Sequence, residues 1–229
     1  MQFVSGMGGT SSDIPTSGQV DSSGNSYVAG LFQGTADFDP GAGTTNLTSA
    51  GANDIFIAKY DSSGALVWAK GVGGTSNDSN VALQIDSSGN SYVTGSFRDT
   101  ADFDPDAGTA NLTSAGSYDS FIAKYDSSGA LVWAKGVGGT GTDIAASMQI
   151  DSGGNSYLIG TFQGTADFDP GAGTTNLTSA GGNDVFIAKY DSTGALVWAK
   201  NAGGTDTDQA ASVTVDSSGN SYVTGIFTG

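Results

Sequence analysis

The chain has 229 residues, 37 of them glycine, and a formal net charge of −16 at pH 7. An acidic surface repels phosphate backbones and anionic membranes, and no apolar run reaches membrane-spanning length, so we expect no nucleic-acid partner and no membrane insertion. Histidine and cysteine are absent and all 23 acids are aspartates. Since this composition removes most general bases, thiol nucleophiles and zinc ligands, we expect no enzyme.

A repeat of 65 residues organises the whole chain. The motif Asp-Ser-Ser-Gly-Asn-Ser-Tyr or its variant Asp-Ser-Gly-Gly-Asn-Ser-Tyr begins at Asp21, Asp86, Asp151 and Asp216. We therefore predict one domain over residues 1–229, containing about three and a half repeats, with partial units at 1–20 and 216–229.

The first twenty residues depart from the repeat. Met1–Gly6 lacks the basic and apolar segments of a signal peptide. Gln2–Gly6 resembles the last strand of a unit, with Phe3 at the position of Trp68 in the next unit. The polar segment Ile14–Gln19 stands where later units have an apolar strand, so we expect an irregular N-terminal edge.

Each full unit predicts two hairpins. In the second unit Val81–Asp86 and Ser91–Phe97 flank a glycine-containing turn, and Ser120–Tyr125 and Ala130–Lys135 flank another. Neither hairpin alternates cleanly between apolar and polar residues, so we expect both faces of the sheet to be covered. The stretch between the hairpins, Ala36–Gly51 in the first unit, predicts a projecting loop with one extra short strand.

Four strands per repeat, with each repeat touching only its neighbours, predict an all-β protein: a β-propeller of four-stranded antiparallel blades. A β-solenoid is the competing fold, but its rungs are much shorter, and a sandwich gives no reason for a fixed period. The expected core between blades contains the large aromatic residues of the second hairpin. These are Phe56, Phe121, Phe186, Trp68, Trp133 and Trp198.

Four motifs closely resemble those of the SBBP type of β-propeller repeat. They are Gly-Gly-Thr-x-x-x-Asp, Asp-Ser-Ser-Gly-Asn-Ser-Tyr-Val-Thr-Gly, Asp-x-Phe-Ile-Ala-Lys-Tyr and Leu-Val-Trp-Ala-Lys. The resemblance covers essentially the whole chain and implies a propeller in a secreted or surface-exposed bacterial or archaeal protein. It transfers no catalytic residue. The first unit departs from the pattern at Phe3 and at Ile14–Gln19.

The predicted strands do not complete a ring. We label the four strands of each unit a to d in chain order, with the Asp-Ser-Ser-Gly-Asn turn between a and b. The chain then contains four a strands, four b strands and four d strands, but only three c strands. Because unpaired strand edges are templates for pairing, we expect self-association by head-to-tail assembly in trans, or completion by further sequence. The competing expectation is a monomeric four-bladed propeller with a frayed edge. The expected assembly edges contain Phe3, Val4, Tyr222, Val223 and Ile226.

Paired aspartates are the candidate metal ligands. They are Asp37, Asp39, Asp102, Asp104, Asp167 and Asp169, with Asp78, Asp143 and Asp208 as a second supplier. Calcium binds six to eight oxygens and tolerates glycine-rich loops, so we regard calcium as the one candidate cofactor. Asp-Pro and Asp-Gly are also ordinary turn sequences, however, and no complete twelve-residue calcium loop is present.

Aromatic side chains could also stack on carbohydrate. The candidates are the three tryptophans, the tyrosines Tyr27, Tyr92, Tyr157 and Tyr222, and the loop residues Phe38, Phe103 and Phe168. Packing between blades is the stronger explanation for the tryptophans. The sequence thus favours a non-enzymatic structural or adhesive module outside the cell. The alternatives are a multivalent lectin-like or calcium-dependent binding propeller, and an engineered repeat protein.

Overall fold

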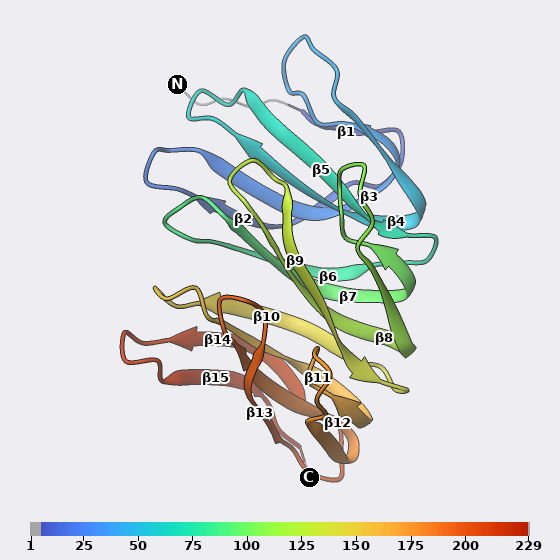
Figure 1. Cartoon of the computed structure of the whole chain (residues 1–229). Helices are drawn as coiled ribbons and strands as arrows, with labels where there is room; N and C mark the ends of the chain where they lie inside the picture. The colour runs from blue at the N-terminus through green and yellow to red at the C-terminus, as the bar shows by residue number, and fades with distance from the viewer. Residues whose placement is uncertain (1–5, 229) are drawn as a thin grey trace.

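The computed structural model describes residues 6–228, which form fifteen β-strands and no helix (Figure 1). All pairings between these strands are antiparallel. The strands are β1 (Gly8–Gly9), β2 (Ile14–Val20), β3 (Ser26–Asp37), β4 (Asn46–Tyr60), β5 (Leu66–Gly74), β6 (Ser79–Ile85), β7 (Ser91–Asp102), β8 (Asn111–Tyr125), β9 (Leu131–Gly139), β10 (Ile144–Ile150), β11 (Ser156–Asp167), β12 (Asn176–Tyr190), β13 (Leu196–Ala202), β14 (Gln209–Val215) and β15 (Ser221–Ile226).

Each repeat folds as a meander of four consecutive strands. In the first unit β2 pairs with β3, β3 with β4, and β4 with β5. Strands β6 to β9 and β10 to β13 repeat this order. An aspartate closes the first turn, because Asp21 Oδ1 accepts hydrogen bonds from the backbone N–H groups of Ser23 and Asn25, each at 2.9 Å. Gly24 supplies the left-handed conformation of that turn, with φ of 83°.

Half of the predicted loop at Ala36–Gly51 is strand, which corrects the sequence interpretation. Strand β3 continues to Asp37 and β4 begins at Asn46, so only residues 38–45 leave the sheet. The register shifts between Gln33 and Thr35, and beyond it Thr35 pairs with Thr48. The Thr35 and Thr48 hydroxyls lie 2.9 Å apart. The additional residues of the repeat therefore extend the hairpin of β3 and β4, and a bulge at the register shift separates this extension from the rest of the hairpin.

Consecutive units are joined by backbone pairing as well as by packing. The last two residues of β5, Gly73 and Gly74, pair with Asp102 and Ala101 of β7 in the next unit. Strands β9 and β11 repeat the link. The three full units and β1 therefore form one continuous sheet of thirteen strands.

Hydrophobic clusters fill the spaces between consecutive units. One cluster combines Tyr27, Ile55 and Ile57 of the first unit with Phe97 and Phe121 of the second. Equivalent clusters join the second unit to the third and the third unit to β14 and β15. Both faces of a middle unit are therefore buried, which explains why its strands do not alternate cleanly between apolar and polar residues.

Strands β1 and β15 lie at opposite ends of the stack (Figure 1). Ile14–Val20 forms the paired strand β2 in spite of its polar sequence. The short strand β1 pairs with the end of β3, as β5 pairs with β7 in the next unit. The predicted strand Gln2–Gly6, with Phe3 and Val4, lies outside the described residues except for Gly6. At the C-terminal end β14 and β15 form a separate two-stranded sheet.

Candidate functional site

The repeated Asp-x-Asp loops use their carboxylates to bind their own backbone. Asp37 Oδ1 accepts hydrogen bonds from the N–H groups of Asp39 at 3.0 Å and Thr45 at 2.8 Å, and these bonds lower the pKa of Asp37. Asp39 Oδ1 accepts the N–H of Gly41 at 2.8 Å. The pairs Asp102 and Asp104, and Asp167 and Asp169, repeat this pattern.

An aromatic anchor also fixes each loop. Phe38 is 1% exposed and packs against Phe32 and Phe56 at centroid distances of 5.8 and 4.9 Å. The Tyr60 hydroxyl donates to the backbone carbonyl of Phe38 at 3.1 Å. Burial, with Asp39 and Asp37 nearby, raises the pKa of Tyr60 to about 12, so the hydroxyl stays a donor at neutral pH.

The same anchor decides which loop aromatics a ligand can reach. Phe38, Phe103 and Phe168 are all 1% exposed or less. These rings therefore present no stacking surface to a carbohydrate. Their role in the structure is to hold the loops against the core.

Within residues 6–228 no group of three or more acidic side chains lies close enough together to hold a metal ion. The loop carboxylates are already bonded to backbone N–H groups, which stabilise them without a cation. We therefore expect the midpoint of thermal unfolding to be the same with and without a chelator. A fall in the midpoint on chelation, restored by calcium, would contradict this prediction and support calcium binding by the loops.

The predicted core aromatics occupy two different environments. Phe56, Phe121 and Phe186 are at most 2% exposed. The tryptophans are only half-buried, and each of the first two reaches into the next unit. Trp68 Nε1 donates to the backbone carbonyl of Ser127 at 3.1 Å, and Trp133 Nε1 donates to that of Ser192 at 3.2 Å.

A tyrosine, a lysine and a tryptophan pack together in every full unit. In the first unit the Lys59 ammonium lies 4.9 Å from the centroid of the Tyr27 ring, and the Trp68 ring lies edge-on to Tyr27 at 6.3 Å. In the next two units Tyr92 and Tyr157 pack against the equivalent lysine and tryptophan of their own unit. The lysines therefore stabilise the units through cation–π contacts.

Three buried aspartate pairs combine a strand aspartate that the sequence interpretation missed with an aspartate that it named only as a metal ligand, namely Asp78, Asp143 or Asp208. Asp54 on β4 is 4% exposed, and Asp78, in the connection to the next unit, is 2% exposed. Asp119 pairs with Asp143, and Asp184 with Asp208, in the same way. The 65-residue period was the available signal, because Asp54, Asp119 and Asp184 recur at the start of the motif Asp-x-Phe-Ile-Ala-Lys-Tyr.

Burial raises the pKa of the carboxyls in the first two pairs. Desolvation raises the pKa of Asp54 to about 6, and desolvation together with the charge of Asp54 raises that of Asp78 to about 8. Asp119 and Asp143 both have pKa values raised to about 6, mainly by burial. At neutral pH these pairs therefore hold protons more tightly than ordinary aspartates do.

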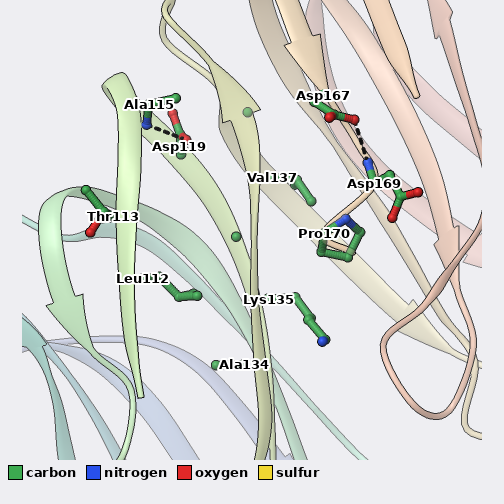
Figure 2. A pocket seen from close by; sticks show the side chains of 12 residues that line it. Leu112, Thr113, Ala115, Asp119, Ala134, Lys135, Val137, Asp167, Asp169 and Pro170 are labelled. Carbon is green, nitrogen blue, oxygen red and sulfur yellow. Dashed lines mark hydrogen bonds between the residues drawn. The ribbon is translucent and has the colours of Figure 1, made fainter. Parts of the chain in front are cut away.

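A cavity of about 300 Å³ lies between the second and third units (Figure 2). Asp119 and Lys135 line one side of it, and Asp167 and Asp169 line the other. The ammonium of the equivalent lysine in the first unit, Lys70, instead forms an ion pair with the Asp106 carboxylate at 2.5 Å.

The difference between the two interfaces follows from one position in the repeat. Gly171 stands in the third unit where the second unit has Asp106. Lys135 therefore lacks the equivalent carboxylate. The chemistry of the cavity suits a small polar molecule, because its lining contains a cation and three carboxylates.

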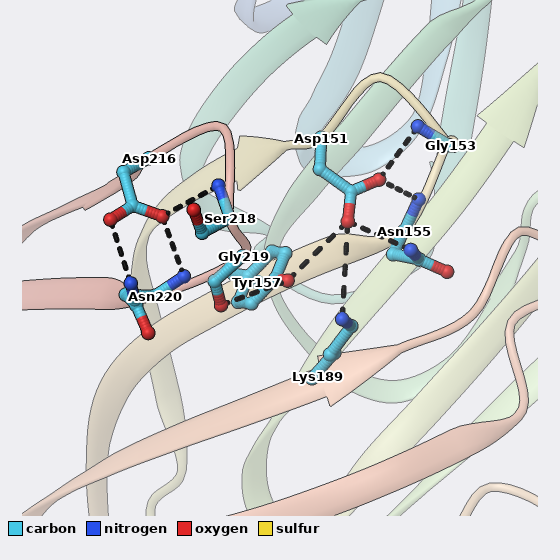
Figure 3. A network of polar contacts seen from close by, with 9 residues as sticks. All are labelled: Asp151, Gly153, Asn155, Tyr157, Lys189, Asp216, Ser218, Gly219 and Asn220. Atoms are coloured by element: carbon cyan, nitrogen blue, oxygen red, sulfur yellow. Dashed lines mark hydrogen bonds and ion pairs between the residues drawn. The ribbon is translucent and has the colours of Figure 1, made fainter.

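A second polar pocket, of about 400 Å³, lies between the turns of the third and fourth units (Figure 3). Asp151 Oδ2 accepts a hydrogen bond from Asn155 Nδ2 at 2.7 Å, and the Lys189 ammonium lies 3.9 Å from the same oxygen. The Tyr157 hydroxyl lies 3.3 Å from Asp151 Oδ2 and 3.4 Å from the Gly219 carbonyl. This network connects the two units.

Strand β15 presents the predicted assembly edge. Tyr222 is 57% exposed and Ile226 is 60% exposed, whereas Val223 packs against the cluster shared with the third unit. The structure pairs β15 with β14 alone. No helix in the described part of the chain is long and apolar enough to cross a membrane.

Two known proteins resemble this chain. An uncharacterized WD repeat-containing protein, L264, of Acanthamoeba polyphaga mimivirus is 31% identical over 212 residues, covering 80% of this chain. The regulatory protein FlaEY of Caulobacter vibrioides is 30% identical over 144 residues, covering 63% of this chain. The chain spans 15% of the length of each of these relatives.

A family model described as a beta-propeller repeat, SBBP, matches residues 197–225. This segment covers β14 and most of β13 and β15. Its motifs recur in the preceding units at intervals of 65 residues. Residues 197–225 are therefore an SBBP-type beta-propeller repeat, in a chain built from successive copies of the same unit.

Proposed function

We propose that this chain is a non-enzymatic structural or adhesive β-propeller module, extracellular or at the cell surface, which assembles through the exposed edge of β15. Its four-stranded meanders act as blades, and a second copy of the chain completes the sheet of β14 and β15. The exposed edge of β15 is the observation that carries the proposal. The repeated loops support a structural role, because their aspartates and phenylalanines are engaged within the chain.

Comparison with the other units indicates what β15 lacks. Tyr27, Tyr92 and Tyr157, at the position of Tyr222, are each 0% exposed. The following strand of their own unit supplies a lysine over the ring, and the strand after it supplies the edge of a tryptophan. Tyr222 is 57% exposed, and no lysine or tryptophan covers its ring within the described residues.

The backbone of β15 makes this edge a template for another strand. In the first unit, β3 pairs with β2 along one side and with β4 along the other. Strand β15 pairs with β14 alone, so one row of its backbone groups is unpaired within the described residues. An added strand would pair with that row and cover Tyr222.

The test is the mass of the chain in solution, measured by light scattering at several concentrations. We expect a mass above that of one chain, and we expect the double variant Tyr222→Lys/Ile226→Lys to have the mass of one chain, because two charges at the edge oppose strand addition. The matched control is Val132→Lys, since Val132 is a 52% exposed strand residue away from this edge. We expect this control to keep the wild-type mass.

Two outcomes would refute assembly through the edge. A wild-type chain with the mass of a monomer at all concentrations would show that copies do not complete one another. An assembly that the double variant leaves intact would place the contact elsewhere.

A further inference from the structure

The strand aspartates of the three buried pairs share one geometry. In each pair, Oδ2 of the strand aspartate accepts the backbone N–H of the residue four positions earlier. The donors are Ala50 at 2.7 Å, Ala115 at 2.9 Å and Ala180 at 3.1 Å. Oδ1 of Asp54, Asp119 and Asp184 is buried and has no hydrogen-bond partner.

In the first pair the unpartnered oxygen lies near the second aspartate. A Cβ atom added to Gly73 would lie 2.5 Å from Asp78 Oδ2 and 2.8 Å from Asp54 Oδ1, so both oxygens border the same glycine. Gly203 borders Asp184 and Asp208 in the same way, but both oxygens of Asp208 accept backbone N–H groups, and so do both oxygens of Asp143. Asp78 Oδ2 is itself buried without a partner. Two buried acceptors that face each other need a positive charge or a donor between them.

The connection between units provides the setting for each pair. The Asp78 backbone N–H donates to the Asn53 carbonyl at 2.9 Å, which ties the connecting segment to β4. The Asp143 and Asp208 backbone N–H groups donate in the same way, to Tyr118 and Asn183, both at 2.7 Å. Each pair therefore lies where the chain crosses from one unit to the next.

The charged groups around the pairs do not supply the missing donor. Lys135 lines the cavity beside Asp119, together with Asp167 and Asp169, yet Asp119 Oδ1 is buried without a partner. At the first interface the corresponding ammonium, that of Lys70, is bound to Asp106. No group of three acidic side chains that could hold a metal ion is present in the part of the chain that the structure describes.

We propose that each pair is a proton-binding site, in which one proton taken from solvent lies between the strand aspartate and the connecting aspartate. In the first pair the carboxylic acid formed on one residue donates its O–H to the unpartnered oxygen of the other. One proton then satisfies both buried oxygens and leaves the pair with a single negative charge. Protonation thereby strengthens the connection between consecutive units.

The direction of the pH dependence follows from the raised pKa values. An unfolded aspartate has its ordinary pKa of 3.8, whereas Asp78 folds with a pKa of about 8 and Asp54, Asp119 and Asp143 with values of about 6. At pH values between the unfolded pKa and the folded pKa values, the folded chain binds more protons than the unfolded chain. Stability is therefore greatest at the acidic end of this range and falls as the pH rises through the folded pKa values.

The turn aspartates do not obscure this effect. Hydrogen bonds within the turns lower the pKa of Asp61, Asp126 and Asp191, among others. Above about pH 4.5 these carboxyls are ionised in both states, so they contribute no pH dependence there. The window from pH 5 to 8 therefore reports on the buried pairs.

The experiment compares thermal unfolding of the wild-type chain and the triple variant Asp54→Asn/Asp119→Asn/Asp184→Asn between pH 5 and 8. The asparagine carbonyl can accept the backbone N–H, and its amide can donate to the connecting aspartate in place of the shared proton. We expect the wild-type midpoint to be about 5 °C or more higher at pH 5 than at pH 8. We expect the variant to lose most of this difference and to exceed the wild type at pH 8.

The variant Asp13→Asn is the matched control. Asp13 accepts the Gly9 N–H at 2.7 Å, as Asp143 accepts that of Gly139, and its Oδ1 is also buried without a partner, but it belongs to no buried aspartate pair in the described residues. We expect this variant to keep the wild-type pH dependence. Infrared spectroscopy provides a direct readout, because the carbonyl stretch of a protonated carboxyl should persist at pH 7 in the wild type and weaken in the triple variant.

Three results would overturn the proposal. One is a wild-type midpoint that is constant or rises from pH 5 to 8. Another is a triple variant that keeps the full pH dependence of the wild type. The third is a midpoint at pH 8 that rises on addition of calcium in the wild type but not in the triple variant, which would show that the pairs bind a metal cation.

Discussion

Replacing Phe121 with alanine is expected to lower the free energy of unfolding by about 3–5 kcal/mol. The ring is 0% exposed and lies 4.7 Å from Phe103 and 6.4 Å from Phe97, measured between centroids. It belongs to the cluster that combines side chains of the first and second units. Its removal therefore leaves a cavity between two units as well as within one. Denaturant titration measures the loss.

The control for this variant is Phe227→Ala, because Phe227 is 54% exposed. We expect that change to alter the free energy of unfolding by about 0.5 kcal/mol or less. Equal losses for the two phenylalanines would contradict the assignment of Phe121 to the core between units. An unchanged denaturant dependence would indicate that both variants unfold from the same folded state.

Replacing Gly139 with alanine is expected to destabilise the chain by about 1–3 kcal/mol. Gly139 pairs with Ala166 of the next unit, and an added Cβ would clash with the backbone carbonyl oxygen of Thr165. A backbone oxygen cannot rotate away, so the two-residue link between β9 and β11 would have to separate. Chemical denaturation of the purified variant measures the effect.

The repeat offers a closely matched control at Gly204. This glycine occupies the same position in the third unit, but an added Cβ would lie 3.4 Å from the Thr228 carbonyl oxygen, which is an ordinary contact distance. We expect Gly204→Ala to leave the stability nearly unchanged. A Gly139→Ala variant as stable as Gly204→Ala would show that the close backbone approach does not matter for stability.

Much of the fold was predictable because the repeat displays it several times. The turn motif recurs every 65 residues, and its aspartate and glycine have local roles that any single unit reveals. The all-β class, the antiparallel strands and the SBBP resemblance are confirmed. The burial of Phe121 follows from a strand that carries bulky apolar residues at successive positions.

The long hairpin was not predicted because its sequence resembles a loop. Asp37–Gly43 contains the proline and glycines of a turn, and they led us to assign the neighbouring residues to the same loop. Beyond the turn, alternation places Leu47 inward and Thr48 opposite Thr35 on the paired strand. The pairing partner decides this conformation, and the local sequence does not identify the partner.

The buried aspartate pairs depend on tertiary structure in the same way. Asp54 and Asp78 are separated by a turn and the whole of β5, so no local spacing joins them. Asp54 alone resembles an ordinary polar residue in a strand, and Asp78 was considered only as a metal ligand. The Asp-x-Asp loops differ from these pairs, because their local sequence pattern did suggest a function, that of metal ligands. In the structure their carboxylates accept hydrogen bonds from nearby backbone N–H groups.

The two-residue ladders between units bear on how the chain would respond to force. Each ladder contains only the pairs made by Gly73 and Gly74, or by Gly138 and Gly139, whereas β3 and β4 pair along eleven positions. Tension applied between β1 and β15 would load the successive boundaries in series, and at each boundary the short ladder and the cluster beside it would share the load. Separation is therefore expected to begin at the boundaries between meanders, so that intact meanders are released one after another.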